Sequence, residues 1–189
     1  MNKQAPAIGF IGMGVLGKGL SLCLADRGYR VTAAHSKSPS SAEWLADRVP
    51  GCRVYSSVQE LCDATDLVFI TTPDAAIGQV AASVSWRTGQ AVVHCCGAAS
   101  REMLHTAARQ GAVTGAFHPY QTFAGLESQE DIGSRLYGVA FAVAGQDNIS
   151  VLQHLKTLRQ TGLVEACQEG KLLIYSLARS DLSEELVLQ

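Results

Sequence analysis

The sequence predicts an α/β protein with a doubly wound, mainly parallel β-sheet and a short C-terminal helical tail. Short apolar runs alternate with segments that carry apolar residues at helical spacing, and glycine, proline or serine separates most of them. Strands that alternate with helices favour parallel pairing in a sheet that helices cover on both faces. Because ligands of such sheets bind beyond the carboxyl ends of the strands, we expect the functional site in the loops that follow them.

The first elements are predicted from apolar runs and the residues that interrupt them. Residues 7–11 form an apolar run that leads into glycines, which predicts a strand, and helical spacing over 15–27 then ends at Gly28. Residues 29–34 predict a second strand, and a proline followed by two serines opens a helix over 39–48.

The same alternation continues as far as residue 145. Further strands are expected at 54, 67–71, 91–95, 113–117 and 138–143, and further helices at 58–62, 74–86 and 100–109. Residues 118–136 form a longer connection, rich in polar residues and glycine, of the kind that often carries function. The remaining residues predict a helix over 149–160, an apolar piece at 163–166 and a last helix over 171–188. We therefore divide the chain into a domain of residues 1–145 and a helical tail of residues 146–189.

Composition limits the classes of function. The 189 residues are 47% hydrophobic and 17% charged, which predicts a folded core, and a net charge of −2 without basic clusters argues against a nucleic-acid partner. The apolar run near the N-terminus is broken at once by glycines, so we do not expect a signal peptide, and no run approaches the roughly 18 apolar residues of a membrane span. Six cysteines in mostly apolar contexts favour reduced thiols and a cytoplasmic protein.

A glycine-rich turn follows the first predicted strand and opens the first predicted helix. Such a turn predicts binding of a dinucleotide pyrophosphate, because the first glycine permits a tight turn, the second a close approach of the ligand, and the third close packing of helix on strand. Free amides at the helix start would then face the anion. The alternative is a turn whose glycines serve packing alone. The turn comprises Gly12, Met13, Gly14, Val15, Leu16 and Gly17.

The end of the second predicted strand favours NADP over NAD. NAD-binding domains place an acidic residue there, about 20 positions after the glycines, to bind the ribose 2′-hydroxyl. Here the residues are His35, Ser36, Lys37 and Ser38, which offer hydroxyl donors and a positive charge for a 2′-phosphate. The alternative interpretation is a solvated loop with an ordinary surface lysine.

Four segments together resemble a known family: GFIGMGVLGKGL, TTPD, HCCGAAS and GAFHPYQTF. Over residues 6–145 the chain is similar to an uncharacterised Rossmann-like, NADP-dependent oxidoreductase family related to pyrroline-5-carboxylate reductase, prephenate dehydrogenase and 6-phosphogluconate dehydrogenase. The resemblance implies that Thr72, Pro73 and Asp74 run past the cofactor diphosphate and ribose. It also implies that the segment from His94 through Cys96 to Gly97 lies toward the nicotinamide. Members usually continue into a helical, often dimer-forming second domain, so we interpret residues 146–189 as its reduced remnant and expect a homodimer.

Three residues are candidates for catalysis. His118 begins a His-Pro pair whose histidine faces the substrate pocket in the prephenate dehydrogenase branch, and histidine exchanges protons near neutral pH. His94 ends a predicted strand, where a core histidine is an equally good interpretation, and Tyr120 could hydrogen-bond a substrate oxygen or simply pack. Adjacent Cys95 and Cys96 lack a metal-ligand spacing, so we expect no metal.

The leading hypothesis from the sequence is an NADP-dependent oxidoreductase that transfers a hydride between nicotinamide and a small carbonyl, imine or hydroxy-acid substrate. A second hypothesis is a non-catalytic NADP-binding or regulatory module that acts through a partner. A third is a protein that binds another adenine nucleotide, or a deazaflavin alongside NADP.

Overall fold

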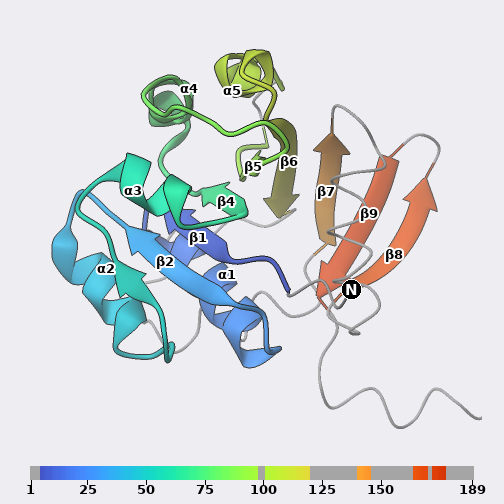
Figure 1. Cartoon of the computed structure of the whole chain (residues 1–189). Helices are drawn as coiled ribbons and strands as arrows, with labels where there is room; N and C mark the ends of the chain where they lie inside the picture. The colour runs from blue at the N-terminus through green and yellow to red at the C-terminus, as the bar shows by residue number, and fades with distance from the viewer. Residues whose placement is uncertain (1–4, 98–100, 120–139, 146–163, 170–171, 178–189) are drawn as a thin grey trace, which may run out of the picture.

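The computed structural model describes residues 5–97, 101–119, 140–145, 164–169 and 172–177, and their strands form one nine-stranded sheet in the order β3-β2-β1-β4-β5-β6-β7-β9-β8 (Figure 1). The first six strands pair in parallel, which confirms the doubly wound α/β fold. These six are β1 (Ile8–Ile11), β2 (Val31–His35), β3 (Arg53–Val54), β4 (Leu67–Ile70), β5 (Ala91–His94) and β6 (Val113–Pro119).

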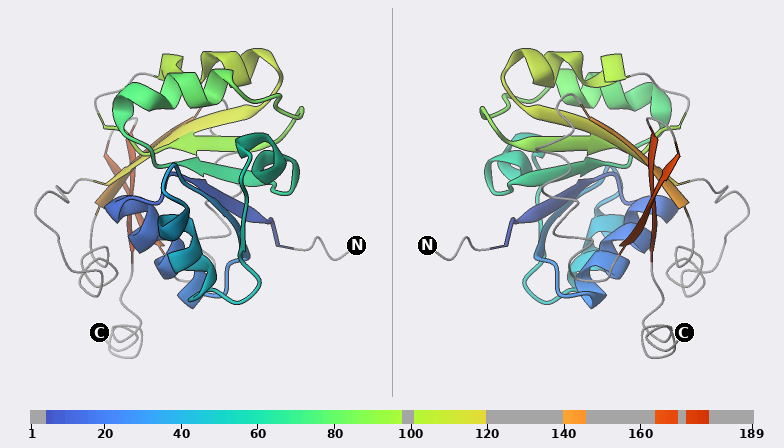
Figure 2. Two further views of the ribbon diagram at one scale, coloured as in Figure 1. Left: turned by 90° about the vertical axis from the view of Figure 1, so that its left-hand side faces the viewer. Right: turned by 90° about the vertical axis from the view of Figure 1, so that its right-hand side faces the viewer.

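Helices cover both faces of this parallel sheet (Figure 2). On one face lie α1 (Val15–Asp26) and α2 (Pro39–Ala46). On the other face lie α3 (Val58–Asp63), α4 (Asp74–Ala82), the short 3-10 helix η1 (Arg101–Leu104) and α5 (His105–Arg109). Among the described residues, no helix has the length and hydropathy to cross a membrane.

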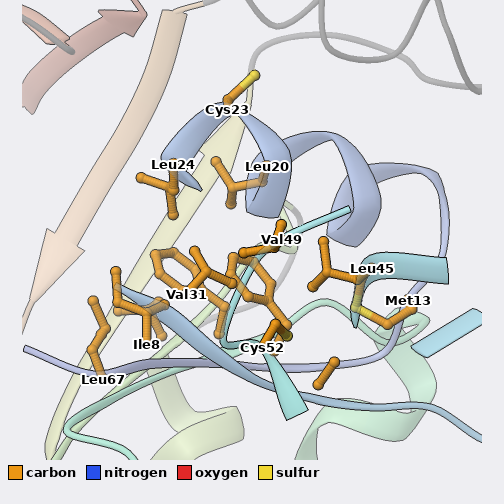
Figure 3. Close-up of a cluster of buried hydrophobic side chains, with 14 of the residues drawn as sticks. Ile8, Met13, Leu20, Cys23, Leu24, Val31, Leu45, Val49, Cys52 and Leu67 are labelled. Carbon is orange, nitrogen blue, oxygen red and sulfur yellow. The ribbon is translucent and has the colours of Figure 1, made fainter. Parts of the chain in front are cut away.

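Alternate strand residues supply two hydrophobic cores, one on each face of the sheet. In β1, Ile8 and Phe10 belong to the core under α1 and α2, whereas Ile11 belongs to the core on the side of α3, α4 and α5. Figure 3 shows the first of these cores, where Leu20 and Leu24 of α1 lie over the sheet. Burial on both faces explains why the strands are apolar runs without polar alternation.

Two strands beyond residue 145 correct the prediction of a helical tail, whereas the strand expected over 138–143 is confirmed at residues 140–145. Beyond β6 the sheet continues through β7 (Ala140–Gly145), β9 (Leu172–Leu177) and β8 (Val164–Glu169), drawn in orange and red in Figure 1, and all three pair antiparallel. The helix expected over 171–188 is therefore wrong for residues 172–177. The second edge of β7 offers β9 a row of backbone hydrogen-bond partners, and such pairing overrides a helical spacing of apolar residues.

The sequence contains a signal for the hairpin of β8 and β9 in the two residues that connect these strands. Glu169 pairs with Leu172, so only residues 170–171 separate the two strands, and a glycine first in a two-residue connection is typical of a hairpin. The helix predicted over 149–160 lies outside the described residues. The domain boundary after residue 145 and the remnant interpretation stay predictions, although β8 and β9 belong to the same sheet as β1.

Two element ends also differ from the prediction. The helix α4 ends at Ala82, four residues before the expected end at Trp86. The strand β6 continues past Phe117 through His118 and Pro119, because β7 pairs with it there and places Ala142 opposite His118. His118 is thus part of a strand, whereas the sequence interpretation placed it just past a strand end.

Phe69 of β4 is central to the core under α1 and α2. Its ring stacks on Phe10 with the centroids 5.0 Å apart and meets the ring of Phe117 edge-on at 6.1 Å. We expect Phe69→Ala to lower the free energy of unfolding by about 3–5 kcal/mol, measured by urea denaturation, because it removes both contacts and leaves a cavity. The control is Val54→Ala on β3, where the side chain is 39% exposed and the expected change is within about 0.5 kcal/mol. Equal losses in the two variants would contradict this account of the core.

Candidate functional site

The turn after β1 is held against the end of β4. Gly12 has a φ of +98°, and a Cβ there would lie 2.7 Å from the backbone nitrogen of Thr72 and 2.9 Å from the carbonyl carbon of Thr71. The Gly12 N–H donates to the His35 carbonyl at 2.8 Å, and the Thr71 hydroxyl donates to the Gly12 carbonyl at 2.5 Å. The ends of β1, β2 and β4 therefore meet at Gly12, where both positive φ and lack of space require glycine.

The other two glycines of the turn have opposite surroundings. A Cβ on Gly17 would overlap the Gly12 carbonyl oxygen and lie 2.8 Å from Thr71 Oγ1, so α1 packs directly on the turn. A Cβ on Gly14 would meet no atom within 4 Å, and Gly14 is exposed. The geometry therefore agrees with the roles expected for the three glycines: a tight turn, an open approach and close helix packing.

The start of α1 presents backbone amides beside this open space. Gly14 is the N-cap residue and provides no side-chain cap, the first turn has no acidic residue, and the first helical hydrogen bond runs from the Lys18 N–H to the Gly14 carbonyl at 3.0 Å. The Met13 side chain is buried in the core beside Leu45 of α2 (Figure 3), whereas Gly14 is exposed. An uncapped helix start with a positive dipole end is suited to a phosphate group. Val15 and Leu16, also named from the sequence, are the first two residues of this helix.

The residues expected to read the ribose lie next to the turn. The His35 ring donates from Nδ1 to the Tyr55 carbonyl at 2.9 Å, which fixes the ring at the end of β2. Ser36 is half-buried, while Lys37 and Ser38 are exposed, and no acidic residue stands among them. The structure thus brings these four residues to the same edge of the sheet as the glycine turn, since the Gly12 N–H is bonded to the His35 carbonyl.

The segment after β4 lies on the other side of the turn. Pro73 is the N-cap of α4 and Asp74 is its first residue, and both are exposed. The Thr72 hydroxyl is buried and has no hydrogen-bond partner among the described residues. Sequence reasoning missed Thr71, whose hydroxyl holds the Gly12 carbonyl. The signal in the sequence was that Thr71, a residue with a hydroxyl group, directly follows the buried strand β4.

His94 is fully buried at the end of β5. Its Nδ1 accepts the Cys96 N–H at 3.3 Å, and its Nε2 has no partner among the described residues. Burial lowers the pKa of His94; the Asp74 carboxylate opposes this shift and His118 adds to it. Burial therefore favours the neutral form of the His94 ring, and a catalytic role for His94 stays a prediction.

His118 lies in β6, beside residues 95–97 that follow β5. Its ring donates from Nδ1 to the Cys95 carbonyl at 3.0 Å, since a carbonyl can only accept. A Cβ on Gly97 would overlap the imidazole ring of His118, so the ring lies directly against the glycine. The structure thus brings His94, Cys96, Gly97 and His118 together, whereas Tyr120 lies outside the described residues.

The cysteines at this site do not resemble a reactive thiol or a metal centre. Burial raises the pKa of the Cys95 thiol, and the nearby Cys96 adds to the shift. Away from this site, burial likewise raises the pKa of the Cys52 thiol to about 11 and that of the Cys62 thiol to about 12. For Cys62, Asp63 adds to the rise and Arg87 opposes it. In the part of the chain that the structure describes, no three histidine, cysteine or acidic side chains gather as metal ligands would.

Comparison with known proteins supports the fold. A family model described as a Rossmann-like domain matches residues 1–119. No curated protein matches the chain. Among solved structures, a Bacteroides fragilis protein assigned to the NADP oxidoreductases is 21% identical with a TM-score of 0.67, and the match covers 83% of this chain and 57% of that one.

Two further structures have the same arrangement. A 3-hydroxyisobutyrate dehydrogenase from Mycobacterium tuberculosis is 19% identical with a TM-score of 0.65, and the match covers 84% of this chain and 51% of that one. A pyrroline-5-carboxylate reductase from Coxiella burnetii is 12% identical with a TM-score of 0.67, covering 84% and 56%. The chain thus spans little more than half the length of these structures, and at such identities the shared feature is the fold. With the strand order, the glycine turn and the family match in agreement, the chain belongs to the Rossmann-like domain family, and its structural neighbours include NADP oxidoreductases.

Proposed function

We propose that the protein is an NADP-dependent oxidoreductase that transfers a hydride between nicotinamide and a small carbonyl, imine or hydroxy-acid substrate. The observation that carries the proposal is the open space at Gly14 beside the uncapped start of α1. This space lies at the carboxyl edge of the sheet, next to β1 and β4, where strand order reverses and doubly wound proteins bind dinucleotides. The backbone amides of Val15 and Leu16 are the groups that would hold the diphosphate.

The preference for NADP rests on charge at the end of β2. Lys37 is exposed there and free to turn toward a 2′-phosphate, and Ser36 and Ser38 supply hydroxyl donors. An acidic residue would repel that phosphate, and the four residues from His35 to Ser38 include none. The Bacteroides fragilis neighbour described as an NADP oxidoreductase, and a structurally similar reductive aminase from Aspergillus terreus described as a complex with NADPH, support the same class of cofactor.

In the proposed reaction, the protein itself supplies a proton donor or acceptor and holds that group in place. A bound nicotinamide would supply the hydride, or take it, at the substrate carbon. Reduction of a carbonyl or imine also requires one proton at the oxygen or nitrogen, and we assign that proton to the half-buried ring of His118. The contact with Gly97 restrains the His118 ring near the carboxyl end of β5.

Two glycine variants separate cofactor binding from folding. We expect Gly14→Ala to weaken NADPH binding at least about tenfold, or about 1.4 kcal/mol, because its methyl group would occupy the space for the diphosphate. Its free energy of unfolding should change by less than about 1 kcal/mol, because Gly14 has a φ of −74° and open surroundings, and the poorer N-cap is offset by the lower entropy of the unfolded chain. Gly17→Ala should instead destabilise the fold by about 1–3 kcal/mol through overlap with the Gly12 carbonyl. Calorimetric titration and urea unfolding test both, and full NADPH affinity in Gly14→Ala would refute the proposed phosphate site.

A charge reversal tests the choice of cofactor. Lys37→Glu should lower the thermal stabilisation by NADPH without lowering the smaller stabilisation by NADH, because the glutamate would repel the 2′-phosphate but could accept a hydrogen bond from the 2′-hydroxyl of NADH. Arg109→Glu makes the same change of charge at an exposed position at the end of α5 and serves as the control. A wild-type protein that prefers NADH, or equal losses for both cofactors in Lys37→Glu, would count against the assignment of this loop.

A further inference from the structure

One peptide group connects the two histidines of the site. The Cys95 carbonyl accepts from His118 Nδ1 at 3.0 Å, and the Cys96 N–H donates to His94 Nδ1 at 3.3 Å. These are the two ends of a single peptide bond, between residues 95 and 96. The rings therefore lie in one hydrogen-bonded chain that runs from His118 through the peptide to His94.

This chain fixes the tautomer of each neutral ring, and the two tautomers are opposite. A carbonyl accepts only, so Nδ1 of His118 carries a proton and the lone pair of the neutral ring is on Nε2. A backbone N–H donates only, so Nδ1 of His94 carries the lone pair and Nε2 the proton. Hydrogen bonds in such a chain polarise one another, so the His94 contact strengthens the carbonyl as an acceptor for His118.

Packing alone does not explain a histidine at position 94. Its Nε2–H is buried without a partner among the described residues, and an unpaired buried donor costs about 1–3 kcal/mol. The neighbours Val92 and Val93 on the same strand show that apolar side chains suit this core. What an apolar side chain would lack is Nδ1, the acceptor for the Cys96 N–H.

We propose that His94 is a positioning residue for His118 and acts through the peptide group between Cys95 and Cys96. By accepting the Cys96 N–H, it holds the Cys95 carbonyl toward Nδ1 of His118, and the proton that enters or leaves His118 in the reaction is then exchanged at Nε2. In the direction of reduction, Nε2 of the protonated ring gives its proton to the substrate oxygen or nitrogen and keeps the lone pair. The catalytic part of this inference rests on the proposed function, whereas the tautomers belong to the protein without ligand.

The tautomers are measured in the 189-residue chain labelled with ¹⁵N-histidine. Long-range ¹H–¹⁵N correlation spectra at pH 8 distinguish Nδ1–H from Nε2–H rings, and single substitutions of the five histidines assign the signals. We expect His118 as the Nδ1–H tautomer and His94 as the Nε2–H tautomer. The opposite tautomer for either ring in the wild-type protein would overturn the proposal without any variant.

Two variants of His94 then test the coupling. His94→Asn should keep His118 in the Nδ1–H tautomer, because a side-chain amide oxygen accepts the N–H two residues on in an Asx-turn. His94→Leu lacks an acceptor and should shift the His118 signals toward those of a free histidine side chain; His94→Ala serves the same purpose if the leucine variant does not fold. An unchanged tautomer in the variant without an acceptor would refute the coupling. NADPH titration of the same proteins reports separately on the proposed function, so a failure there leaves the tautomer result standing.

Discussion

The close approach of Gly12 to the backbone of Thr71 and Thr72 is the constraint on which the site depends. It brings the ends of β1 and β4 within van der Waals contact, and the Thr71 hydroxyl closes the contact by donating to the Gly12 carbonyl. Gly17 then packs on that same carbonyl, so the axis and the first turn of α1 are set by the turn itself. The open space at Gly14 exists because its neighbours in the turn are fixed in this way.

Much of this arrangement could be predicted from the sequence because it depends on local features. Strands that are buried on both faces, such as Leu67–Ile70, are continuous apolar runs. In the GxGxxG motif, the position of each glycine indicates whether it serves the tight turn, the approach of a ligand or the packing of the helix. Helix starts were found where a residue signals them, as with Pro39 at the start of α2. These features identify the six parallel strands of the sheet and the edge at which a ligand would bind.

The remaining features depend on contacts between residues far apart in the sequence. Helical spacing after residue 170 suggested a helix, but β7 offers an edge that only the folded sheet possesses, and residues 173–176 pair with it. The length of β6 has the same cause, because pairing with β7 extends it through His118. The hydrogen bond from His118 to Cys95, across 23 positions, and the contact of its ring with Gly97 likewise have no local signal. The sequence indicated the chemistry of His118 and His94, whereas their tautomers follow only from the fold.

If the backbone amides at the start of α1 hold a phosphate, their NMR signals must respond to the cofactor. NADPH is titrated into ¹⁵N-labelled protein while the amide signals of Gly14, Val15 and Leu16 are followed. We expect these signals to move downfield and saturate together, as for N–H groups that donate to a phosphate. Saturable NADPH binding that leaves these three amides unmoved, or no binding at millimolar NADPH, would contradict this expectation.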